Sequence, residues 1–513
     1  MKNAVVSQNI SVLNSLLRGR RADIVGVVGP QTVAIYASSQ ALTSRNGQWI
    51  LTLAANLLAR MAPIVGHVYL EMEEDLLLMK PAPMLDGTTI GQSILGLASE
   101  ISCGVAFSVC KPDEQKVDLR ISVGRSGPKS QVQAASNGWL AFLNRNVEPG
   151  SNENPVGAYV AACLAVCEAF KYLLENLRLD SALKRPVFFH EGIQFSAFNY
   201  SVNQPEAKNP ALPSEVKVGP LLVAGVGSGG SAAILTLSAI PGIKGPFALV
   251  DPDEIIGRNL HRYPFAIQQH ADQAVKKVRI AAEFLGCDSG QECLVKDTTY
   301  EACAEELRQR GFLDLVVATV HTGTARRRIQ RDLPRVLLDG AVTENGEAVV
   351  RRVFFGESAC MGCFYPQTSI YDETKVMAQA LGLQVSEVQE LMGSNGRFNA
   401  DQVHRISERI DAPPIVGERW GDWRQKCAKL PLFVENRSTE VPAAFVTAIA
   451  GVLIAGEVLK ERAFPQAVLK SYYVLDTLGR FCPAYPYLRR PSEDCDICGD
   501  PDALEVYRKR YCL

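Results

Sequence analysis

The chain has 513 residues, with 53 basic and 55 acidic side chains, so its formal net charge is −2. Hydrophobic residues make up 47% and charged residues 21%, which is typical of a globular chain large enough for two or three domains. A net charge this close to zero provides neither the basic field that nucleic acid requires nor a polybasic membrane signal. We therefore expect no nucleic-acid partner and no membrane attachment.

The opening segment, 1–21, places its basic side chains after the apolar ones, which is the reverse of a secretory leader. We therefore expect a cytoplasmic protein. Fourteen cysteines in such a chain predict reduced thiols, a few of them with metal or catalytic roles. The longest apolar run, 441–456, is too short and too rich in small residues for a bilayer span, and it predicts a buried helix.

Residues 1–210 alternate expected strands with helices, a pattern that indicates a parallel sheet. Strands are expected over 22–28, 64–71 and 117–123, and a helix over 49–61. The segment 200–218 is rich in Pro, Asn and Ser, and we expect it to link this half to the rest of the chain.

Two expected helices, 154–171 and 448–460, are similar to each other. Both are rich in small residues, and both close on Glu, two apolar residues and Lys. The similarity indicates an internal duplication, with chance likeness between two buried helices as the alternative.

A glycine-rich turn follows the expected strand 221–224 and opens a small-residue helix. Gly225, Gly227 and Gly230 allow backbone N–H groups to approach phosphate oxygens, and the start of the helix adds partial positive charge. A second strand, 247–250, ends in Asp251, whose carboxylate can accept hydrogen bonds from a ribose hydroxyl. The segment therefore predicts a nucleotide site.

Polar and cationic side chains follow Asp251. Asp253, Asn259 and Arg262 lie just beyond the ribose position, and Lys277 begins the next helix. Hydride transfer has no use for cations there, so an NAD-dependent oxidoreductase is disfavoured. Cleavage of ATP between its α- and β-phosphates builds negative charge that fixed cations stabilise, and the pattern therefore favours adenylation.

Two CxxC pairs follow, Cys360 with Cys363 and Cys495 with Cys498. Each pair can direct two thiolates at one ion, and four thiolates suit tetrahedral Zn²⁺, so we expect a structural zinc site. Redox pairs are the alternative, and we disfavour them because neither pair is expected to open a helix as a thioredoxin motif would.

Taken in this order, the motifs resemble those of the ubiquitin-activating enzymes and their bacterial relatives, the ThiF-type and MoeB-type adenylyltransferases. The resemblance covers about residues 210–500 and includes the glycine turn, the Asp-x-Asp motif, the run 258–262 and the helix KVRIAAEFL. It implies ATP, Mg²⁺ and Zn²⁺ as ligands. It also implies roles for individual residues: the ribose at Asp251, the phosphates at Asn259 and Arg262, and the α/β bridge at Lys277.

The resemblance further implies an α/β fold with two Rossmann-like adenylation domains, inactive over 1–210 and active over 211–513. The first half lacks the signature, because Gly26 and Gly29 are followed by Pro30 and no Asp-x-Asp motif appears downstream. This arrangement is most like a bacterial, single-chain ubiquitin-activating enzyme. In that family the inactive half lends an arginine to the ATP phosphates. The candidates are Arg18, Arg20 and Arg21, with a solvated basic cluster as the alternative.

One position departs from the family pattern. Relatives carry a magnesium-binding Asp after the fourth strand, where this chain has His321, and imidazole is a poor ligand for that hard ion. Either Asp339 supplies the oxygen, or ATP and water hold the ion, or the site is inactive. The retained motif residues disfavour the last. The run 326–328, three arginines, is either a solvated helix face or a site for an acidic partner.

An insertion over about 365–440 is expected to carry the second half-reaction. By resemblance, a cysteine ahead of the last buried helix attacks the acyl-adenylate, and Cys427 lies at that place. Its neighbours Lys426 and Lys429 favour the reactive thiolate. Cys482 is a rival, and a structural role is the alternative for either thiol.

These expectations combine into an enzyme that adenylates the C-terminal carboxylate of a ubiquitin-like protein with ATP and captures it as a thioester on Cys427. Arg262 and Lys277 assist the first step, and a ubiquitin-conjugating-like enzyme receives the acyl group. A sulfur-carrier-protein adenylyltransferase, which would be a homodimer, is one alternative. A non-catalytic scaffold that keeps the fold and the zinc is another. A homodimer of the present chain stays possible.

Overall fold

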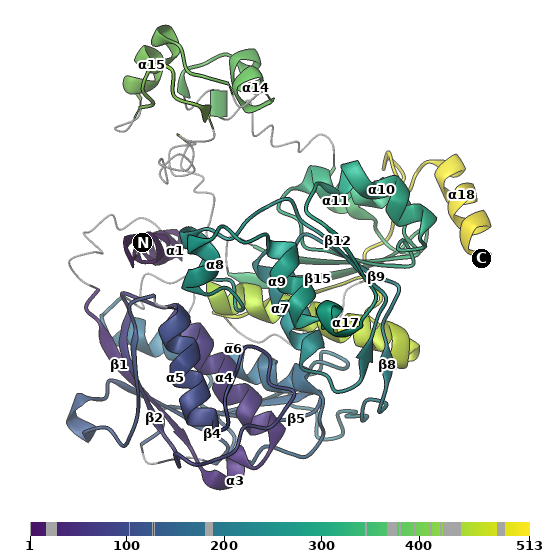
Figure 1. The fold of residues 1–513 in the computed structure, drawn as a ribbon. Coiled ribbons are helices and arrows are strands. Elements are labelled where there is room, and N and C mark those ends of the chain that lie inside the picture. The colour runs from purple at the N-terminus through teal and green to yellow at the C-terminus, as the bar shows by residue number, and fades with distance from the viewer. Residues whose placement is uncertain are drawn as a thin grey trace. The chain divides into compact units, whose positions relative to one another are not determined.

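The structure, a computed structural model, describes most of the chain and forms two compact units (Figure 1). One unit contains 1–365 and 442–513, and the other contains 366–441. The described residues are 2–16, 28–101, 103–125, 127, 129–179, 188–343, 346–366, 377–378, 381–393, 396–409, 413–420, 423, 443–479 and 488–512.

The first half of the larger unit contains a seven-stranded sheet in the order β3-β2-β1-β4-β5-β6-β7. The first five strands in this order pair in parallel, and β6 and β7 pair antiparallel. β4 is buried along its whole length and β1 is buried except at Thr32 and Tyr36, as expected for parallel strands covered on both faces. The strands are β1 (Gln31–Ala37), β2 (Val65–Glu71), β3 (Ala106–Val109), β4 (Leu119–Val123), β5 (Val132–Asn137), β6 (Leu140–Leu143) and β7 (Ile193–Ser196).

The second half repeats this arrangement in the order β12-β11-β9-β13-β14-β15-β16. Again five strands are parallel and the last two antiparallel. The repeated order agrees with the internal duplication expected from the two similar helices. The strands are β9 (Leu221–Ala224), β11 (Phe247–Val250), β12 (Cys293–Lys296), β13 (Leu315–Ala318), β14 (Val336–Val342), β15 (Glu347–Phe354) and β16 (Tyr472–Asp476), with a separate pair β8 (Val216–Lys217) and β10 (Ile243–Lys244).

The two halves meet along buried helices. α6 (Pro155–Asn176) packs on α4 (Arg45–Ala59), and α17 (Ala444–Ala463) packs on both α6 and α7 (Ser228–Ser238). Figure 1 shows α17 where the halves meet. α6 is long and apolar enough to cross a membrane, but 94% of its most apolar window is buried inside the protein, as in the core helix of a globular domain.

Each long interface helix carries a fully buried ion pair between residues three positions apart. Glu168 pairs with Lys171 on α6, and Glu457 pairs with Lys460 on α17. Glu457 also accepts hydrogen bonds from the Tyr200 hydroxyl and the Leu469 N–H. These pairs are the Glu and Lys positions that made the two helices similar in sequence.

The remaining helices cover the sheets or belong to the smaller unit. Around the larger unit lie α1 (Lys2–Leu16), α3 (Ser39–Leu42), α5 (Ile90–Ile101), α8 (Gln268–Asp272), α9 (Lys277–Phe284), α10 (Tyr300–Gln309), α11 (Gly323–Arg331), α12 (Met361–Phe364) and α18 (Pro501–Tyr511), with 3₁₀ turns at Glu114–Lys116, Gly257–Asn259 (η3), Cys287–Ser289 and Pro465–Ala467. The smaller unit contains α14 (Val385–Gly393) and α15 (Ala400–Ser407), packed around Leu391, Phe398, Trp420 and Trp423.

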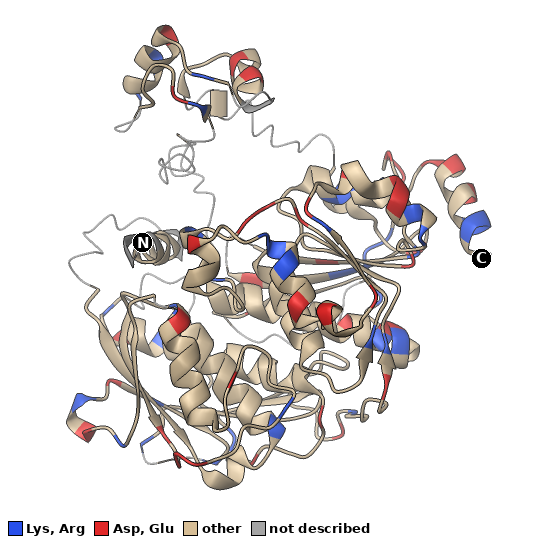
Figure 2. Cartoon of the chain, viewed as in Figure 1, with Lys and Arg blue, Asp and Glu red and all other residues tan. Residues whose placement is uncertain are grey.

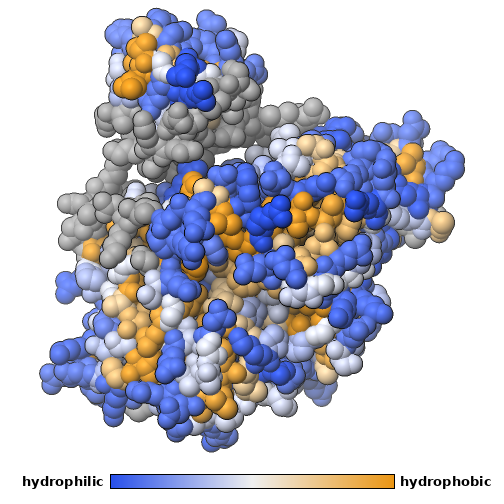
Figure 3. Space-filling view, viewed as in Figure 1, coloured by the Kyte–Doolittle hydropathy of each residue, from blue (hydrophilic) through white to orange (hydrophobic). Residues whose placement is uncertain are grey.

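The surface carries no dominant charge on the side shown. Figure 2 shows basic and acidic side chains interspersed over both halves, in keeping with the formal net charge of −2. Figure 3 shows apolar side chains in patches divided by hydrophilic ones on the same side. The exposed large apolar residues among those described are Leu77, Ile415, Val416, Leu488 and Val506.

The mixed α/β fold with mainly parallel sheets is confirmed, and most of the strands expected in the first half can be compared with the structure. The strand expected over 22–28 falls largely on residues outside those described, and Val28 belongs to no strand. The first strand of the sheet is β1, which begins directly after Pro30. β2 and β4 lie within two residues of their expected starts. Strands β5 to β7 were not expected, because each is short and lacks a long apolar run.

Candidate functional site

The glycine turn joins β9 to α7 at the carboxyl edge of the second sheet. Gly225 has a φ of +89°, and a Cβ there would lie 2.8 Å from the Thr319 carbonyl carbon. A Cβ at Gly230 would lie 2.3 Å from the Gly225 oxygen. These two glycines are therefore required by the close packing of the turn itself.

Gly227 has a different environment. A Cβ there would meet nothing closer than the Tyr263 hydroxyl at 3.6 Å. Gly227 is also the N-cap of α7, and no side chain caps this helix. The first N–H groups of α7 therefore lack a side-chain capping acceptor, and the N-cap has room for a neighbour at van der Waals distance, which suits an anionic ligand.

Asp251 follows β11 and is 6% exposed. Its two oxygens accept hydrogen bonds from the backbone N–H of Val226, at 2.6 Å, and of Asp253, at 2.9 Å. Burial raises the pKa of this carboxyl, and the neighbouring Lys277 ammonium opposes the shift. The contact with Val226 anchors the carboxylate directly beside the glycine turn.

Lys277 is the first residue of α9 and reaches back to both aspartates. Its Nζ lies 2.7 Å from Asp253 Oδ2 and 3.9 Å from Asp251 Oδ1, and 5.2 Å from the centre of the Tyr263 ring. Burial disfavours the ammonium, but Tyr263 and the two carboxylates outweigh it and raise the pKa of Lys277. The structure thus brings the glycine turn, Asp251, Asp253 and Lys277 together.

The segment after Asp253 turns through η3. Asn259 is buried, and its side-chain oxygen accepts a hydrogen bond from the Ile256 N–H, so this amide stabilises the turn. Arg262 precedes Tyr263, the residue that approaches both Gly227 and Lys277. The buried Arg262 Nε has no hydrogen-bond acceptor among the described residues. A buried cationic donor without an acceptor is costly, and a bound phosphate would satisfy it.

Asp339 was one of the expected sources of a magnesium ligand, and the structure does not support that role. Its carboxylate is completely buried and accepts hydrogen bonds from Arg326 Nε and Arg351 Nη1, each at 2.5 Å. Arg326 also donates to the backbone carbonyl of the exposed His321. Both Asp339 oxygens are therefore engaged by arginines.

The arginine run 326–328 is also engaged within the protein. Arg326 and Arg327 are 6% and 8% exposed, and Arg327 pairs with Asp496 at 2.5 Å. Arg328 pairs with Asp332 at 3.4 Å. Neither the solvated helix face nor the partner site expected for this run fits these contacts, because two of the three guanidinium groups are buried.

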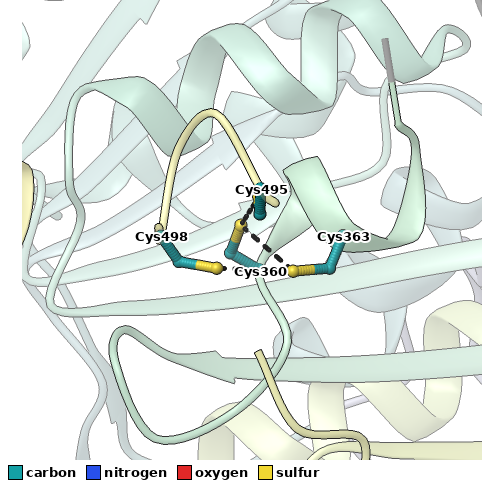
Figure 4. A group of neighbouring side chains, drawn as sticks. All are labelled: Cys360, Cys363, Cys495 and Cys498. Carbon is teal, nitrogen blue, oxygen red and sulfur yellow. Dashed lines mark hydrogen bonds between the residues drawn. The ribbon is translucent and has the colours of Figure 1, made fainter. Parts of the chain in front are cut away.

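Four cysteine sulfurs gather beside α12 (Figure 4), each within 4.8 Å of the others. The Sγ atom of Cys360 lies 4.0 Å from that of Cys363 and 3.5 Å from that of Cys495, and Cys363 Sγ lies 3.3 Å from Cys498 Sγ. Zinc–sulfur bonds of about 2.3 Å in a tetrahedron place sulfurs roughly 3.8 Å apart. The cluster is therefore compatible with zinc.

One reason for disfavouring redox chemistry at these pairs was wrong. Cys360 is the N-cap of α12, so the first pair does open a short helix. Two backbone N–H groups donate to the sulfurs, from Gly362 to Cys360 at 3.2 Å and from Ser492 to Cys363 at 3.3 Å. The convergence of four sulfurs, rather than the absence of a helix, is what favours a metal over a redox pair.

A disulfide joins Cys287 and Cys293, between the end of α9 and the edge strand β12. This pair departs from the expectation of reduced thiols throughout. The two cysteines are six positions apart in sequence, and their Cα atoms lie 5.6 Å apart, within the range that a disulfide spans. Spacing alone gave no signal, because the pair matches no metal or redox motif.

Several expected site residues lie outside the described residues. These are the candidate nucleophile and its rival, and the arginines proposed to reach the phosphates: Cys427, Cys482, Arg18, Arg20 and Arg21. Their roles stay predictions, as do those of the nucleotide-site residues described above.

Comparison with known proteins places these features in a family. Residues 215–495 match the ThiF family, and residues 32–190 match the BilD N-terminal domain. The chain is also similar to the uncharacterized protein y4jF of Sinorhizobium fredii (strain NBRC 101917 / NGR234). The two are 27% identical over 514 residues, which cover 95% of this chain and 93% of y4jF.

The ThiF family implies adenylyltransferase-type activation of a carrier or ubiquitin-like protein, with ATP and Mg²⁺. The matched segment contains the glycine turn, both aspartates, Lys277 and three of the four clustered cysteines, and it ends three residues before Cys498. Because this match spans more than half of the 513 residues, the chain belongs to the ThiF family.

Proposed function

We propose that the protein activates the C-terminal carboxylate of a ubiquitin-like protein with ATP and then holds the acyl group as a thioester on Cys427. One observation carries the first step: Asp251, Asp253 and Lys277 converge on the glycine turn, while the neighbouring Arg262 presents a buried donor without an acceptor. This arrangement suits the phosphates and ribose of a nucleotide.

In the proposed first step, an oxygen of the substrate carboxylate attacks the α-phosphorus of ATP. A bond forms between them, the bond from the α-phosphorus to the bridging oxygen breaks, and pyrophosphate leaves with its electron pair. Lys277 and Arg262 stabilise the negative charge that develops on the phosphate oxygens. Lys277 is held by Asp253, whose side chain is 65% exposed, so the ion pair can open toward a ligand.

Magnesium would be held mainly by the phosphates and water in this proposal. Asp339 is engaged by two arginines, and His321 offers imidazole, which this ion avoids. The ion supplies additional positive charge to the leaving pyrophosphate.

In the proposed second step, the Cys427 thiolate attacks the acyl-adenylate carbonyl. A carbon–sulfur bond forms, and AMP leaves with the electrons of the broken carbon–oxygen bond. Transfer of the acyl group to the thiol of a ubiquitin-conjugating-like enzyme would follow, with Cys427 as the leaving thiolate. The four-cysteine cluster would hold a structural zinc and take no part in either step.

ATP–pyrophosphate exchange tests the first step. We expect exchange that requires a ubiquitin-like protein, is lost in Arg262→Ala, and persists in Cys427→Ala. We expect the wild type, but not Cys427→Ala, to form an adduct that thiol reductants cleave. Exchange without such an adduct would favour the sulfur-carrier alternative. If no carrier supports exchange by the wild type, the adenylation proposal fails and the scaffold alternative stands.

A further inference from the structure

Arg60 lies at the C-terminal end of α4 in the first half and is completely buried. Its guanidinium donates to three backbone carbonyls of the second half. Nη1 donates to Leu260 at 2.5 Å, and Nη2 donates to Pro264 at 2.9 Å and Ala266 at 3.0 Å. A single side chain of the first half therefore holds the carbonyls of the segment 260–266, which contains Arg262 and Tyr263.

Arg60 is held in turn by other residues of the first half. Its Nε donates to Asn56 Oδ1 at 2.9 Å, and Asn56 Nδ2 donates to the Pro264 carbonyl at 2.8 Å. Asn9 of α1 donates to the Arg60 and Ala62 carbonyls at 2.7 and 2.6 Å, and α1 itself contacts η3. The segment 260–266 is thus bound by two side chains from the end of α4, and α1 contacts the turn that directly precedes it.

The charge on Arg60 has no acidic partner among the described residues, where its acceptors are one amide oxygen and three carbonyls. Burial lowers the pKa of Arg60 to about 10, so the guanidinium stays protonated near neutral pH. A buried cation depends on each of these four acceptors. Because the guanidinium is planar and its N–H directions are fixed, it tolerates little displacement of the acceptors. This requirement couples the position of 260–266 to the first half.

The second half has no equivalent arginine. α4 and α7 are the long helices that come after β1 and β9, which occupy the same place in the two strand orders, but the residue after α7 is Ala239. The contact therefore runs from the first half to the candidate phosphate segment without a symmetric counterpart. It is not a general requirement of the repeated fold.

We propose that Arg60 is a positioning residue for adenylation: it holds the segment 260–266 from the first half so that Arg262 and Tyr263 are placed for ATP. The proposal rests on the proposed function, since it assigns Arg60 to the same nucleotide site. Arg60 acts through the backbone of this segment and is not itself a catalytic residue.

The test compares Arg60→Met with Arg60→Lys and with a matched control, Arg120→Met. Arg120 is also a buried arginine of the first half, but it pairs with Glu71 and Glu114 of that half. Two measurements are made on the full chain: ATP affinity by titration calorimetry, and hydrogen–deuterium exchange of peptides that cover 257–266. Thermal unfolding is recorded for each variant.

For Arg60→Met we expect ATP affinity to fall by about 10- to 100-fold, because small displacements of binding groups have effects of this size. We expect amide exchange over 257–266 to accelerate. Arg60→Lys should restore part of the ATP affinity and part of the amide protection. The restoration is partial because a lysine ammonium can reach fewer of the three carbonyls than the guanidinium does. Arg120→Met should lower the unfolding temperature while ATP affinity and exchange over 257–266 stay at wild-type values.

ATP affinity within twofold of wild type in Arg60→Met would overturn the proposal and leave Arg60 with a structural role only. If the wild type binds no ATP, the proposed function fails. Hydrogen–deuterium exchange still tests whether Arg60 positions the segment. This claim is overturned if the amides of 257–266 exchange no faster in Arg60→Met than in the wild type. Should Arg60→Met fail to fold, Asn56→Leu provides the test, because it removes one partner of Arg60 and the bond to Pro264 while leaving the cation in place.

Discussion

The two halves share a strand order and differ at the edge where the parallel strands end. In the first half the chain itself covers the start of α4, where Asn46 Nδ2 donates to the Gly150 and Asn152 carbonyls at 2.9 and 2.8 Å. In the second half the start of α7 is left open in a narrower sense: its N-cap is Gly227, no side chain caps the helix, and a Cβ at Gly227 would meet nothing closer than 3.6 Å.

The acidic groups at the ends of equivalent strands differ as well. Glu71 ends β2 and pairs with Arg120 of the same half, whereas Asp251 follows β11 and accepts two backbone N–H groups near Lys277. A repeated topology therefore does not by itself repeat the side chains of the candidate nucleotide site. The side chains at the carboxyl edge decide whether the edge is filled or open.

The largest expected difference between the halves comes from the cysteine cluster, which belongs to the second half. We expect about one zinc ion per purified chain and its loss in Cys495→Ser. The variant should lose about 5 kcal/mol or more of unfolding free energy, because structural zinc binds with apparent free energies of roughly 10–16 kcal/mol. Elemental analysis measures the zinc content, and chemical denaturation measures the unfolding free energy.

Cys303→Ser is the control for this prediction, since Cys303 is buried but lies outside the cluster. It should keep the zinc. A wild-type chain that contains no zinc and is unaffected by chelators would contradict the assignment.

The buried ion pairs of α6 and α17 allow the stability of the two halves to be compared at their interface. Replacing one partner leaves a buried charge unpaired, which costs about 3–5 kcal/mol. We expect Glu457→Gln to cost more than Glu168→Gln, because Glu457 accepts two further hydrogen bonds, from Tyr200 and Leu469, whereas Glu168 accepts one, from the Phe189 N–H. Chemical denaturation of the two variants measures the difference. Equal costs would show that these extra hydrogen bonds contribute little.

Lys277→Met tests the open edge directly. We expect a loss of about 10²- to 10³-fold in the rate of ATP–pyrophosphate exchange, equivalent to about 2.7–4 kcal/mol, because a fixed donor to developing charge is removed. The counterpart in the first half is Arg120→Met, which should leave the exchange rate unchanged. If both variants lost activity equally, the comparison between a filled and an open edge would fail.

The smallest expected effect concerns His261, which is 1% exposed. Burial, followed by the nearby Arg262 charge, lowers the pKa of His261 well below its usual range, so the folded chain keeps this imidazole neutral. The unfolded chain takes up a proton near pH 6.5. Stability should therefore fall as the pH drops below about 6.5, by up to about 1.4 kcal/mol per pH unit.

Unfolding temperatures measured from pH 7.5 to 5 check this sign. The slope of unfolding temperature against pH should decrease in His261→Gln. It should persist in His404→Gln, because the His404 side chain is 73% exposed. An unchanged slope in His261→Gln would assign the pH dependence to other groups. His67 and His270 also have pKa values lowered by burial and contribute in the same direction.

The sequence by itself determined the parts of the candidate site that lie on consecutive strand and helix units. Gly225 and Asp251 follow β9 and β11, which pair in the same parallel sheet, and Lys277 begins the next long helix, α9. Their meeting at one edge therefore follows from local patterns and topology. The mixed α/β class and the clustering of two CxxC pairs were predictable for the same reason: short motifs specify local geometry.

Only the tertiary structure decided which buried charges are already occupied. Asp339 looked available in sequence, but Arg326 and Arg351 engage it. Arg60 carried no signal, because its acceptors lie about 200 residues away along the chain. Local propensity extends over a few residues, whereas the partner of a buried charge is chosen by long-range packing. That packing places Arg60 of the first half on the candidate phosphate segment, 260–266, of the second.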